Sequence, residues 1–480
     1  MRDAAVVVCR YRVCLCWAVC LCWLTGCAVG PNYKRPATQT PAQFRQPAEI
    51  AQPADKASLA DVNWAELFHD DTITNLVKTA LQQSFDLQAA TQRVLEARAQ
   101  LGVVRSQLFP QLSASGSYNA TRNSNIGAFN VVTPGTNFSA SYAQAGFNLS
   151  WEVDLWGRLR RLTESARAQY LAQEDARHAV VSSLIADVIT TYLDLRELDL
   201  ELDISRQTRD LAERGLSITR LRKARGIAAG LDIRQAEELL YTATTQIAET
   251  ERVTAETENM LSILLGQYPG EIPRGKPLVD VVEPPKVPAG LPSDLLERRP
   301  DIQQAEHNLI AANAQIGAAK ALFFPQITLT GFLGVQSRAL NNLFTGNARQ
   351  QDLAPAAVLP IFNAGQLRNN LRLTQAQQLE AVANYRKTIQ TAFEEVSNAL
   401  SDYQKNREQR AQEELLVNAL RDADRLSTLR YRGGLDSYLQ VLDAQRNEFS
   451  GELVLAQLRK NEMLSIVQLY RALGGGWQNL

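Results

Sequence analysis

Few side chains in this sequence could carry out chemistry, and the thiols among them are confined to one end. All six cysteines lie within the first 27 of 480 residues, at Cys9, Cys14, Cys16, Cys20, Cys22 and Cys27. The three histidines, His69, His178 and His307, are widely spaced and have no second ligand type nearby. We therefore expect no metal site. The sequence also lacks a Walker-type phosphate loop, a G-x-S-x-G elbow and an H-E-x-x-H pair. We expect no catalytic residues, no enzymatic activity and no cofactor.

The first 27 residues indicate export followed by lipid attachment. Arginines precede an apolar run of 12 residues, 13–24, which is shorter than the about 20 residues of a spanning helix. The run ends in Leu24-Thr25-Gly26-Cys27, which resembles the lipobox of bacterial lipoproteins. That resemblance implies a signal peptide over 1–26 and lipid, such as palmitate, on Cys27. The lipid would anchor the chain at a membrane surface. An apolar leader with an incidental cysteine is the alternative.

Composition and charge indicate a folded chain that is not expected to bind nucleic acid. Hydrophobic residues make up 45% and charged residues 21%, as in ordinary globular proteins. Fifty Lys and Arg against 51 Asp and Glu leave a net charge of -1. A nucleic-acid partner is not expected, because phosphate neutralisation needs a basic excess.

The sequence contains an internal duplication. Leu108-Phe109-Pro110-Gln111 recurs as Phe323-Phe324-Pro325-Gln326, shifted by 215 positions. Beyond this segment the shift is 208 and stays constant, from Gly157 and Gly365 to Leu265-Gly266 and Leu473-Gly474. We divide the mature chain into an N-terminal segment (27–66), a first repeat (67–266), a Pro-rich linker (267–291), a second repeat (292–474) and a tail (475–480). A constant shift is what helices held in register by their neighbours would produce.

Each repeat predicts long helices. From Leu87 to Leu108 apolar residues are spaced alternately by three and four, which is the heptad pattern of coiled coils, and we expect a helix over about 72–107. No proline occurs between Leu155 and Gly226, so about 70 residues could form one helix on the order of 100 Å long. Gly226 then marks a turn into a second long helical pattern.

Four segments have a period of two instead. They span about 111–121, 143–155, 326–336 and 353–362; the last alternates poorly and contains Pro355 and Pro360. This pattern is typical of membrane β-strands, apolar towards lipid and polar towards water, with Trp151 and Trp156 as interfacial aromatics. A soluble hairpin with one wet face is the alternative for any single strand. Because four strands cannot close a sheet, we expect oligomerisation, with three copies forming a barrel of about twelve strands.

Several motifs resemble one known family. They are Trp64-Ala65-Glu66-Leu67-Phe68 with Asp70, the repeated Phe-Pro-Gln, Trp151-Glu152-Val153-Asp154-Leu155-Trp156-Gly157-Arg158, and Leu291-Pro292-Ser293-Asp294-Leu295-Leu296-Glu297-Arg298-Arg299-Pro300-Asp301-Ile302. Together with Cys27, they resemble the outer-membrane efflux proteins, the TolC-like channel tunnels. The lipoprotein branch of that family, which serves resistance-nodulation-division (RND) pumps, is the most similar. One departure is Asn363-Ala364-Gly365, where Asp-Gly-Gly is usual.

The resemblance implies a mainly α fold with a membrane β-barrel. A homotrimer would form a 12-stranded barrel in outer-membrane lipid, an equatorial region and a long α-helical tunnel extending into the periplasm. Its partners would be a periplasmic membrane-fusion adaptor and an inner-membrane RND-type pump. The chain would be a passive conduit for drugs or other small molecules, whose identity the sequence does not specify.

The resemblance also places functional residues at the two helical turns. The family's pore-narrowing pattern maps onto Tyr431, Asp436, Leu439 and Asp443, where trimer symmetry would gather three Asp443 carboxylates and three Leu439 side chains around one axis. Such a gate would be closed and sensitive to cations. Helix-capping and surface roles are the alternative. We expect the turn residues Arg225, Gly226, Gly433 and Gly434 to contact the adaptor.

Two other classes fit the pattern in part. A structural, lipid-anchored coiled-coil protein without transport activity would explain the heptads and the anchor, but not the lipid-facing alternation or the duplication. An adaptor would carry one helical hairpin flanked by β-rich domains, whereas this sequence predicts the hairpin twice.

Overall fold

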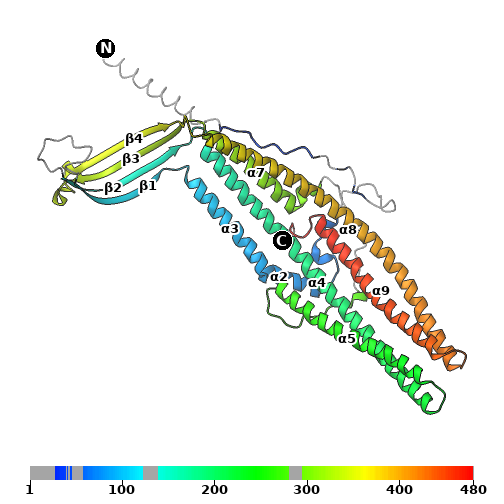
Figure 1. Cartoon of the computed structure of the whole chain (residues 1–480). Coiled ribbons are helices and arrows are strands. Elements are labelled where there is room, and N and C mark those ends of the chain that lie inside the picture. Colours follow the sequence, from blue (N-terminus) through cyan, green and yellow to red (C-terminus); the bar gives the residue numbers. More distant parts are fainter. Residues whose placement is uncertain are drawn as a thin grey trace. The chain divides into compact units, whose positions relative to one another are not determined.

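A computed structural model describes residues 28–38, 41, 44–45, 58–122, 139–280 and 294–478 (Figure 1). The chain divides into two compact units. One comprises residues 1–36, 94–172 and 305–385 and contains the β-sheet; the other comprises 37–93, 173–304 and 386–480 and contains the helical hairpins. The predicted signal peptide and Cys27 lie outside the described residues, as does the linker from 281 to 291.

The predicted duplication is present in the helices. Helices α3 (Phe85–Ser106) and α7 (Pro300–Ala321) have 22 residues each and differ by the 215-residue shift. Helices α4 (Arg158–Ala224) and α8 (Gln366–Arg432) have 67 residues each, and α5 (Gly230–Leu264) and α9 (Tyr438–Ala472) have 35 each, both pairs at the 208-residue shift. The two repeats therefore share one backbone plan.

The first predicted helix is broken. Instead of one helix over 72–107, the structure has α2 (Asp71–Gln83) and α3, separated at Ser84, whose ψ of 128° is not helical. At this break, the glycine at 266 lies against the backbone of Gln83 and Ser84, where a side chain at 266 would collide. The carboxylate of Asp70 caps α2 by accepting a hydrogen bond from the Thr72 amide at 2.7 Å.

The four strands form one antiparallel sheet in the order β1-β2-β3-β4. They are β1 (Gln111–Arg122), β2 (Ser139–Val153), β3 (Gln326–Ser337) and β4 (Arg349–Val358). The first three overlap their predicted ranges closely. The fourth begins and ends four residues before the predicted 353–362, because its pairing with β3 includes polar residues that do not alternate.

The helical unit has its own hydrophobic core. Trp64, Leu67 and Phe68 of the first motif are buried in it with the central part of α4, including Tyr192. The Arg-Arg-Pro-Asp motif packs at its edge: Arg299 is buried, donates to Asp301, Glu395 and the Ala472 carbonyl, and precedes Pro300 at the first position of α7. Within the described residues, α4 alone has a stretch long and apolar enough to cross a membrane, but 61% of it is buried in the structure.

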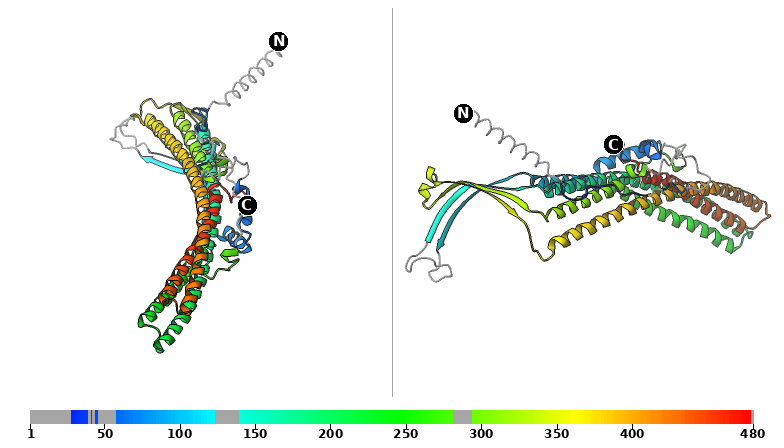
Figure 2. Two further views of the ribbon diagram at one scale, coloured as in Figure 1. Left: turned by 90° about the vertical axis from the view of Figure 1, so that its right-hand side faces the viewer. Right: turned by 90° about the horizontal axis from the view of Figure 1, so that it is seen from above.

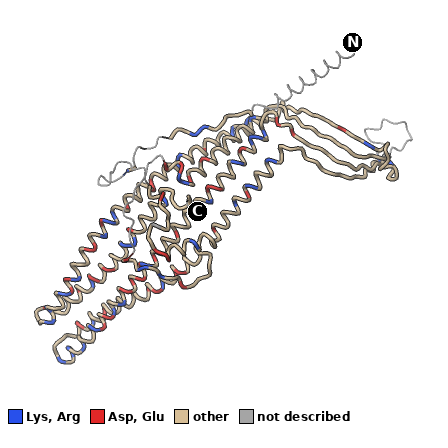
Figure 3. Tube along the Cα trace, turned by 180° about the vertical axis from the view of Figure 1, so that it is seen from behind, with Lys and Arg blue, Asp and Glu red and all other residues tan. Residues whose placement is uncertain are grey.

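Short 3-10 turns complete the described chain. They are Leu59–Asp61, Trp64–Glu66, Leu278–Asp280, Leu340–Asn342 and Gly346–Ala348, and one further helical turn, α6 (Leu295–Arg298), precedes α7. Figure 3 shows charges of both signs spread along the helices and few charges on the strands. The helices are therefore suited to water on their outer faces.

Candidate functional site

The two helical hairpins end in matching turns. The α4–α5 and α8–α9 hairpins lie side by side in both views of Figure 2, and their turns contain Gly226 and Gly434, with φ of 74° and 75°. A side chain at either position would meet open space, so the left-handed backbone rather than crowding requires glycine. In the first turn, the amides of Gly226 and Ile227 donate to the carbonyls of Lys223 and Arg222. In the second turn, the amides of Gly434 and Leu435 donate to the carbonyls of Tyr431 and Arg430. This is the Schellman motif, which fixes the hairpin bend.

The predicted adaptor-contact residues lie on these turns. Arg225, Gly226, Gly433 and Gly434 are all exposed. The first turn is strongly basic, since Arg220, Arg222, Lys223 and Arg225 all lie within its last helical turns and nearest loop. Asp232 is the first acidic residue after the turn, and its carboxylate accepts a hydrogen bond from the Ala229 amide at 2.9 Å. The first turn therefore presents mainly positive charge, although Arg220 is paired with Glu237 at 3.0 Å.

The first of the predicted gate residues, Tyr431, links the two hairpins. Its ring lies 5.1 Å from the ring of Tyr438, and the Arg222 guanidinium of α4 lies 4.5 Å above its centroid. Tyr438 is buried with Leu216 and Leu239 of the first hairpin. Neither Arg222 nor Tyr438 was expected at this site. Arg222 could not be predicted from spacing in the sequence, because it belongs to the other repeat. Tyr438 could have been predicted, because an aromatic residue stands at the first position of α9.

Asp436 forms an ion pair inside its own turn. The Arg430 guanidinium donates to both of its carboxylate oxygens, at 2.5 and 3.2 Å. These hydrogen bonds hold the pKa of Asp436 below its usual range. Asp436 is thereby engaged across the turn, and Arg430 is a further site residue that the sequence pattern did not identify.

Leu439 and Asp443 are placed together on α9. They are four residues apart, so they lie one turn apart on the same helix face. Both are exposed, whereas Tyr438, Val441 and Leu442 are buried on the opposite face. Within the described part of the chain, Asp443 has no ion-pair partner. The structure therefore divides the predicted set: Tyr431 and Asp436 stabilise the turn, and Leu439 and Asp443 present an apolar and an anionic group to the outside.

Comparisons with known proteins match nearly the whole chain. A family model described as "Outer membrane efflux protein" matches residues 76–267 and 291–475. The chain is 39% identical to the probable efflux pump outer membrane protein TtgC of Pseudomonas putida, over 95% of this chain and 93% of TtgC. It is 35% identical to the cation efflux system protein CusC of Escherichia coli, over 95% and 97%. The open state of the MtrE outer membrane channel of Neisseria gonorrhoeae superposes with a TM-score of 0.84 at 30% identity, covering 94% of this chain and 99% of that one.

This chain belongs to the outer membrane efflux protein family. It is an outer-membrane component of an efflux system, and it has the fold of the TolC-like channels. The family match falls into two segments that coincide with the two repeats, so the duplication is a property of the family's fold as well as of this sequence.

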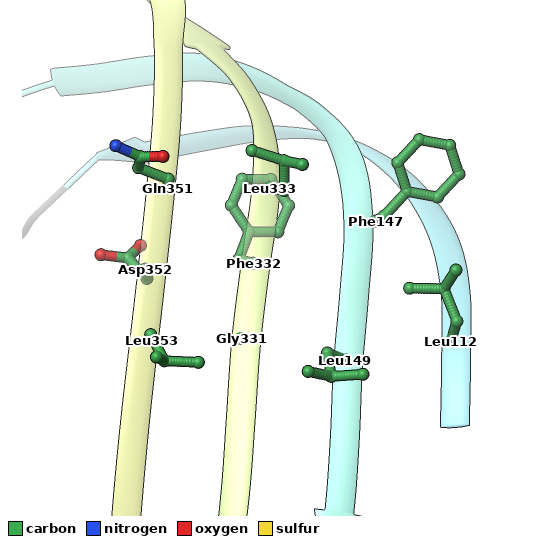
Figure 4. Close-up of a pocket in the computed structure, with 9 residues that line it drawn as sticks. All are labelled: Leu112, Phe147, Leu149, Gly331, Phe332, Leu333, Gln351, Asp352 and Leu353. Atoms are coloured by element: carbon green, nitrogen blue, oxygen red, sulfur yellow. The ribbon is translucent and has the colours of Figure 1, made fainter. Parts of the chain in front are cut away.

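The sheet of this efflux protein has one apolar and one polar face. Leu112, Leu149, Gly331 and Leu353 are in register across the four strands, and Figure 4 shows them in one row beneath Phe147 and Leu333. They border a shallow groove of about 530 Å³. The next row of paired residues, Ser113, Asn148, Phe332 and Asp352, is polar except for Phe332, and Phe332 and Asp352 also line the groove. Such alternation suits a strand with lipid on one side and water on the other.

The two tryptophans predicted for the membrane interface occur where β2 meets α4. The indole N–H of Trp151 donates to the Leu108 carbonyl at 3.0 Å, and that of Trp156 donates to the Pro325 carbonyl at 2.8 Å. Trp156 also stacks on Phe324, with ring centroids 4.9 Å apart. Each indole N–H is therefore satisfied by a backbone carbonyl next to a strand end.

The first described residues of the efflux protein contact the same junction. Ala28 lies so close to Gly157 that a side chain at 157 would collide with it, and the Val29 amide donates to the Trp156 carbonyl at 3.0 Å. Further along, Tyr33 and Arg35 both donate to the Glu306 carboxylate of α7, at 2.9 Å and at 2.8 and 2.6 Å. Ala28 and Val29 are thus held where β2 meets α4, and Tyr33 and Arg35 are held against the N-terminal part of α7.

Metal binding has no support in the described part of the efflux protein. Within residues 28–38, 41, 44–45, 58–122, 139–280 and 294–478, no group of three or more His, Cys, Asp or Glu is arranged to hold an ion.

The structure brings Leu439 and Asp443 together, and it joins Tyr431 and Asp436 to partners that sequence analysis missed.

Proposed function

We propose that this chain is the passive exit conduit of a tripartite efflux system. Three copies form the channel, a periplasmic membrane-fusion adaptor contacts them, and an inner-membrane RND-type pump supplies drugs or other small molecules and the energy for export. The observation that carries this proposal is the duplicated hairpin-and-strand plan, whose four-stranded sheet leaves both edge strands unpaired within the described chain. A sheet of four strands needs further copies to enclose a water-filled lumen.

The conduit performs no covalent chemistry in this proposal. Small molecules pass along a water-filled path lined by polar side chains such as Ser113, Asn148 and Thr330, which lie on the polar face of the sheet. Relatives are named for antibiotic, toluene and cation efflux. The cargo of this chain is a small molecule delivered by its own pump, and the tunnel wall does not select it.

Leu439 and Asp443 are proposed as the gate. In a trimer, three Leu439 side chains form an apolar constriction and three Asp443 carboxylates form an anionic ring one helical turn further along α9. Tyr431 and Asp436 hold the turn that carries them. Single-channel conductance of the double variant Leu439→Ala, Asp443→Ala tests this role: the conductance should rise, and an unchanged conductance would exclude the gate.

The exposed turns are proposed as the adaptor contact. A cysteine placed at Arg225 or Gly433 should form a cross-link to the adaptor in cells, while one placed at the exposed Tyr268, away from both turns, should not. Equal cross-linking from all three positions would contradict the proposal.

Cys27 is proposed to carry the lipid anchor. Ala28 and Val29, which follow Cys27, lie beside Gly157 and Trp156, where β2 meets α4. A lipid on Cys27 would therefore be attached close to the ends of the strands. Mass spectrometry of the mature chain tests this: the N-terminal peptide should carry acyl groups, and a Cys27→Ala form should not. An unmodified wild-type peptide would contradict the proposal.

The exit function is tested by dye accumulation. Cells lacking the gene should accumulate more ethidium than wild-type cells, and restoring the gene should reverse the change. If accumulation does not change, purified protein in a planar bilayer decides the matter: a protein that does not conduct would support the alternative, a structural lipid-anchored coiled-coil protein.

A further inference from the structure

The first described residues lie along one face of helix α7. We call residues 28–35 the strap; it begins where β2 meets α4 and continues beside α7 (Figure 1). The residues of α7 that contact the strap are spaced by seven and four positions, so they share one face of the helix. They are Glu306, Asn313 and Gly317. The strap runs antiparallel to α7, with Gly30 at Gly317 and Arg35 at Glu306.

The strap and the helix face match in length. The five residue steps from Gly30 to Arg35 span about 16 Å in an extended chain, at about 3.3 Å per step. The eleven helical steps from Glu306 to Gly317 also span about 16 Å, at about 1.5 Å per step. The strap can therefore stay in contact with α7 along its length without a bulge.

Close backbone contacts hold the end of the strap that is nearer the sheet. A side chain at Gly30 would collide with the backbone of Gly317, and a side chain at Gly317 would collide with the Val29 carbonyl. Gly30 also has a φ of 109°, which favours glycine. The Asn313 side chain donates to the Pro31 carbonyl at 3.1 Å. This end of the strap therefore has no room for larger residues.

A second helix contacts the strap through Arg161. This α4 residue is 5% exposed, and its guanidinium donates to the Asn32 side-chain oxygen at 2.7 Å and to the Gly30 carbonyl at 3.5 Å. Helix α4 belongs to the first repeat and α7 to the second. The strap therefore connects the two repeats.

Glu306 holds the other end of the strap. It is 8% exposed, and among the described residues every hydrogen bond to its carboxylate comes from Tyr33 or Arg35. Burial, followed by the hydrogen bond to Glu306, raises the pKa of Tyr33, so this hydroxyl keeps the proton that it donates.

The helix side of this contact offers Glu306 no cation among the described residues. Its neighbour there is Tyr385 of α8, which is fully buried and whose hydroxyl has no hydrogen-bond partner in the described chain. Burial, followed by the charge of Glu306, raises the pKa of Tyr385. If the strap left α7, Glu306 would lose its paired guanidinium, which is unfavourable for a buried carboxylate.

We propose that the strap staples α7 to α4 and that Glu306 is the positioning residue that keeps the strap docked. The carboxylate of Glu306 and the donors of Tyr33 and Arg35 satisfy one another only when the strap lies on α7. A force on the chain at residue 28 is then carried by the helices. This role requires neither assembly of several copies nor export, so it can be tested independently of both.

Trypsin tests the docking, because it can cut the strap at one bond. The enzyme cleaves after Lys34, whereas the bond after Arg35 precedes Pro36 and resists cleavage. The full mature protein in detergent is treated briefly with trypsin, and mass spectrometry measures how fast chains that begin at Arg35 appear. A synthetic peptide of residues 28–38 gives the rate for an undocked strap. Cleavage after Arg225, in the exposed first turn, is the internal reference.

Two variants of α7 should release the strap without changing the cleaved sequence. Glu306→Gln removes the charge but keeps the shape of the side chain, and cleavage after Lys34 should become about ten-fold faster. Gly317→Ala introduces the collision with the strap but favours the helix itself. It should also speed cleavage, by less than Glu306→Gln, because the collision lies farther from the cleaved bond. Asn308→Ala, at an exposed position of α7, should leave the rate unchanged.

The wild-type strap should be cut at least about a hundred-fold more slowly than the peptide. Cleavage at the peptide's rate would show that the strap is not docked. A wild-type rate in Glu306→Gln would overturn the role of Glu306. Equally faster cleavage after Arg225 in the two variants would also overturn the proposal, because it would show that they loosen the whole chain.

Discussion

The two hairpin ends have the same backbone and different side chains. In the second repeat Leu439 and Asp443 occupy the exposed face of α9, and their counterparts in the first repeat, 208 residues earlier, are Leu231 and Gln235 of α5. Asp436 likewise corresponds to Ala228. Both turns close with the same Schellman bonds. The comparison shows that the duplicated backbone fixes where a side chain is presented, while the individual residue decides whether that place carries charge.

The two strand-to-helix junctions differ in the same way. Trp156 stacks on Phe324, which is 36% exposed. The counterpart of Trp156 is Ala364, and the counterpart of Phe324 is Phe109, which is 56% exposed. The two junctions therefore differ in the side chain present at matching positions, an indole in one and a methyl group in the other.

The largest expected effect separates the two hairpin ends. Replacing Leu439 and Asp443 with alanine should raise single-channel conductance several-fold, because the apolar constriction and the carboxylate ring are both removed. The matched variant in the first repeat, Leu231→Ala with Gln235→Ala, should leave the conductance unchanged. Planar-bilayer recording measures both, and equal effects would show that the two ends share the gating role.

The next effect concerns the junction inside the chain. Trp156→Ala should lower the free energy of unfolding by about 2 kcal/mol, because the ring stack on Phe324 and the hydrogen bond to Pro325 are both lost. Trp156→Phe keeps a stacked ring and should lose only about 1 kcal/mol. Urea titration in detergent, followed by circular dichroism, measures the difference. Identical losses would mean that stacking contributes nothing.

A smaller effect of opposite sign is expected at the second junction. Ala364 has a φ of 48°, a left-handed conformation that disfavours a side chain, whereas its counterpart Trp156 has no positive φ. Ala364→Gly should therefore raise the free energy of unfolding by about 1 kcal/mol. The control Ala376→Gly, at an exposed position inside α8, should lower it by about 1 kcal/mol. The same urea titration applies, and a loss of stability at 364 would contradict the strain.

The smallest effect is a pH dependence that depends on Glu201 of α4. Burial, and then the neighbouring Glu197 carboxylate, raise the pKa of Glu201 to about 7, and the Lys460 ammonium opposes the rise. Lys460 also lies 3.2 Å from Asp194 and 3.4 Å from Glu197. Because the pKa of Glu201 is higher in the folded chain than in the unfolded chain, protonation of this carboxyl stabilises the folded state. This stabilisation is fully present below about pH 4.5 and is lost as the pH rises through about 7.

The counterpart of Glu201 is Gln409, which does not titrate. Glu201→Gln should therefore flatten the decline in melting temperature between about pH 5 and pH 7.5. Thermal unfolding across that range measures the slope. A slope that survives in Glu201→Gln would assign the pH dependence to another group.

Much of this fold could be predicted from the sequence because its patterns are long and repeated. The proline-free stretch before Gly226 predicted α4, and the period of two predicted three strands within a few residues. The break at Ser84 could not be predicted, since the helical pattern continues through it and the segment that contacts it, at Gly266, is distant in the sequence. The bounds of β4 were wrong because pairing with β3, rather than hydrophobic alternation, sets where that strand begins.

The candidate site was predictable in position but not in partnership. Spacing along α9 placed Leu439 and Asp443 on one face, which follows from the helical period alone. It gave no information on Arg222, which reaches Tyr431 from the other hairpin, or on Arg430, whose ion pair with Asp436 depends on the shape of the turn.

The equal lengths of the paired helices have a genetic consequence. A ring of six hairpins built from six copies of a single-hairpin chain would be encoded once, so every codon change would appear at all six places. In this chain the 67- and 35-residue helices occur twice in one gene, and in a trimer one codon change reaches only every second hairpin. Mutation can then adjust one set of three while the other set keeps the ring intact.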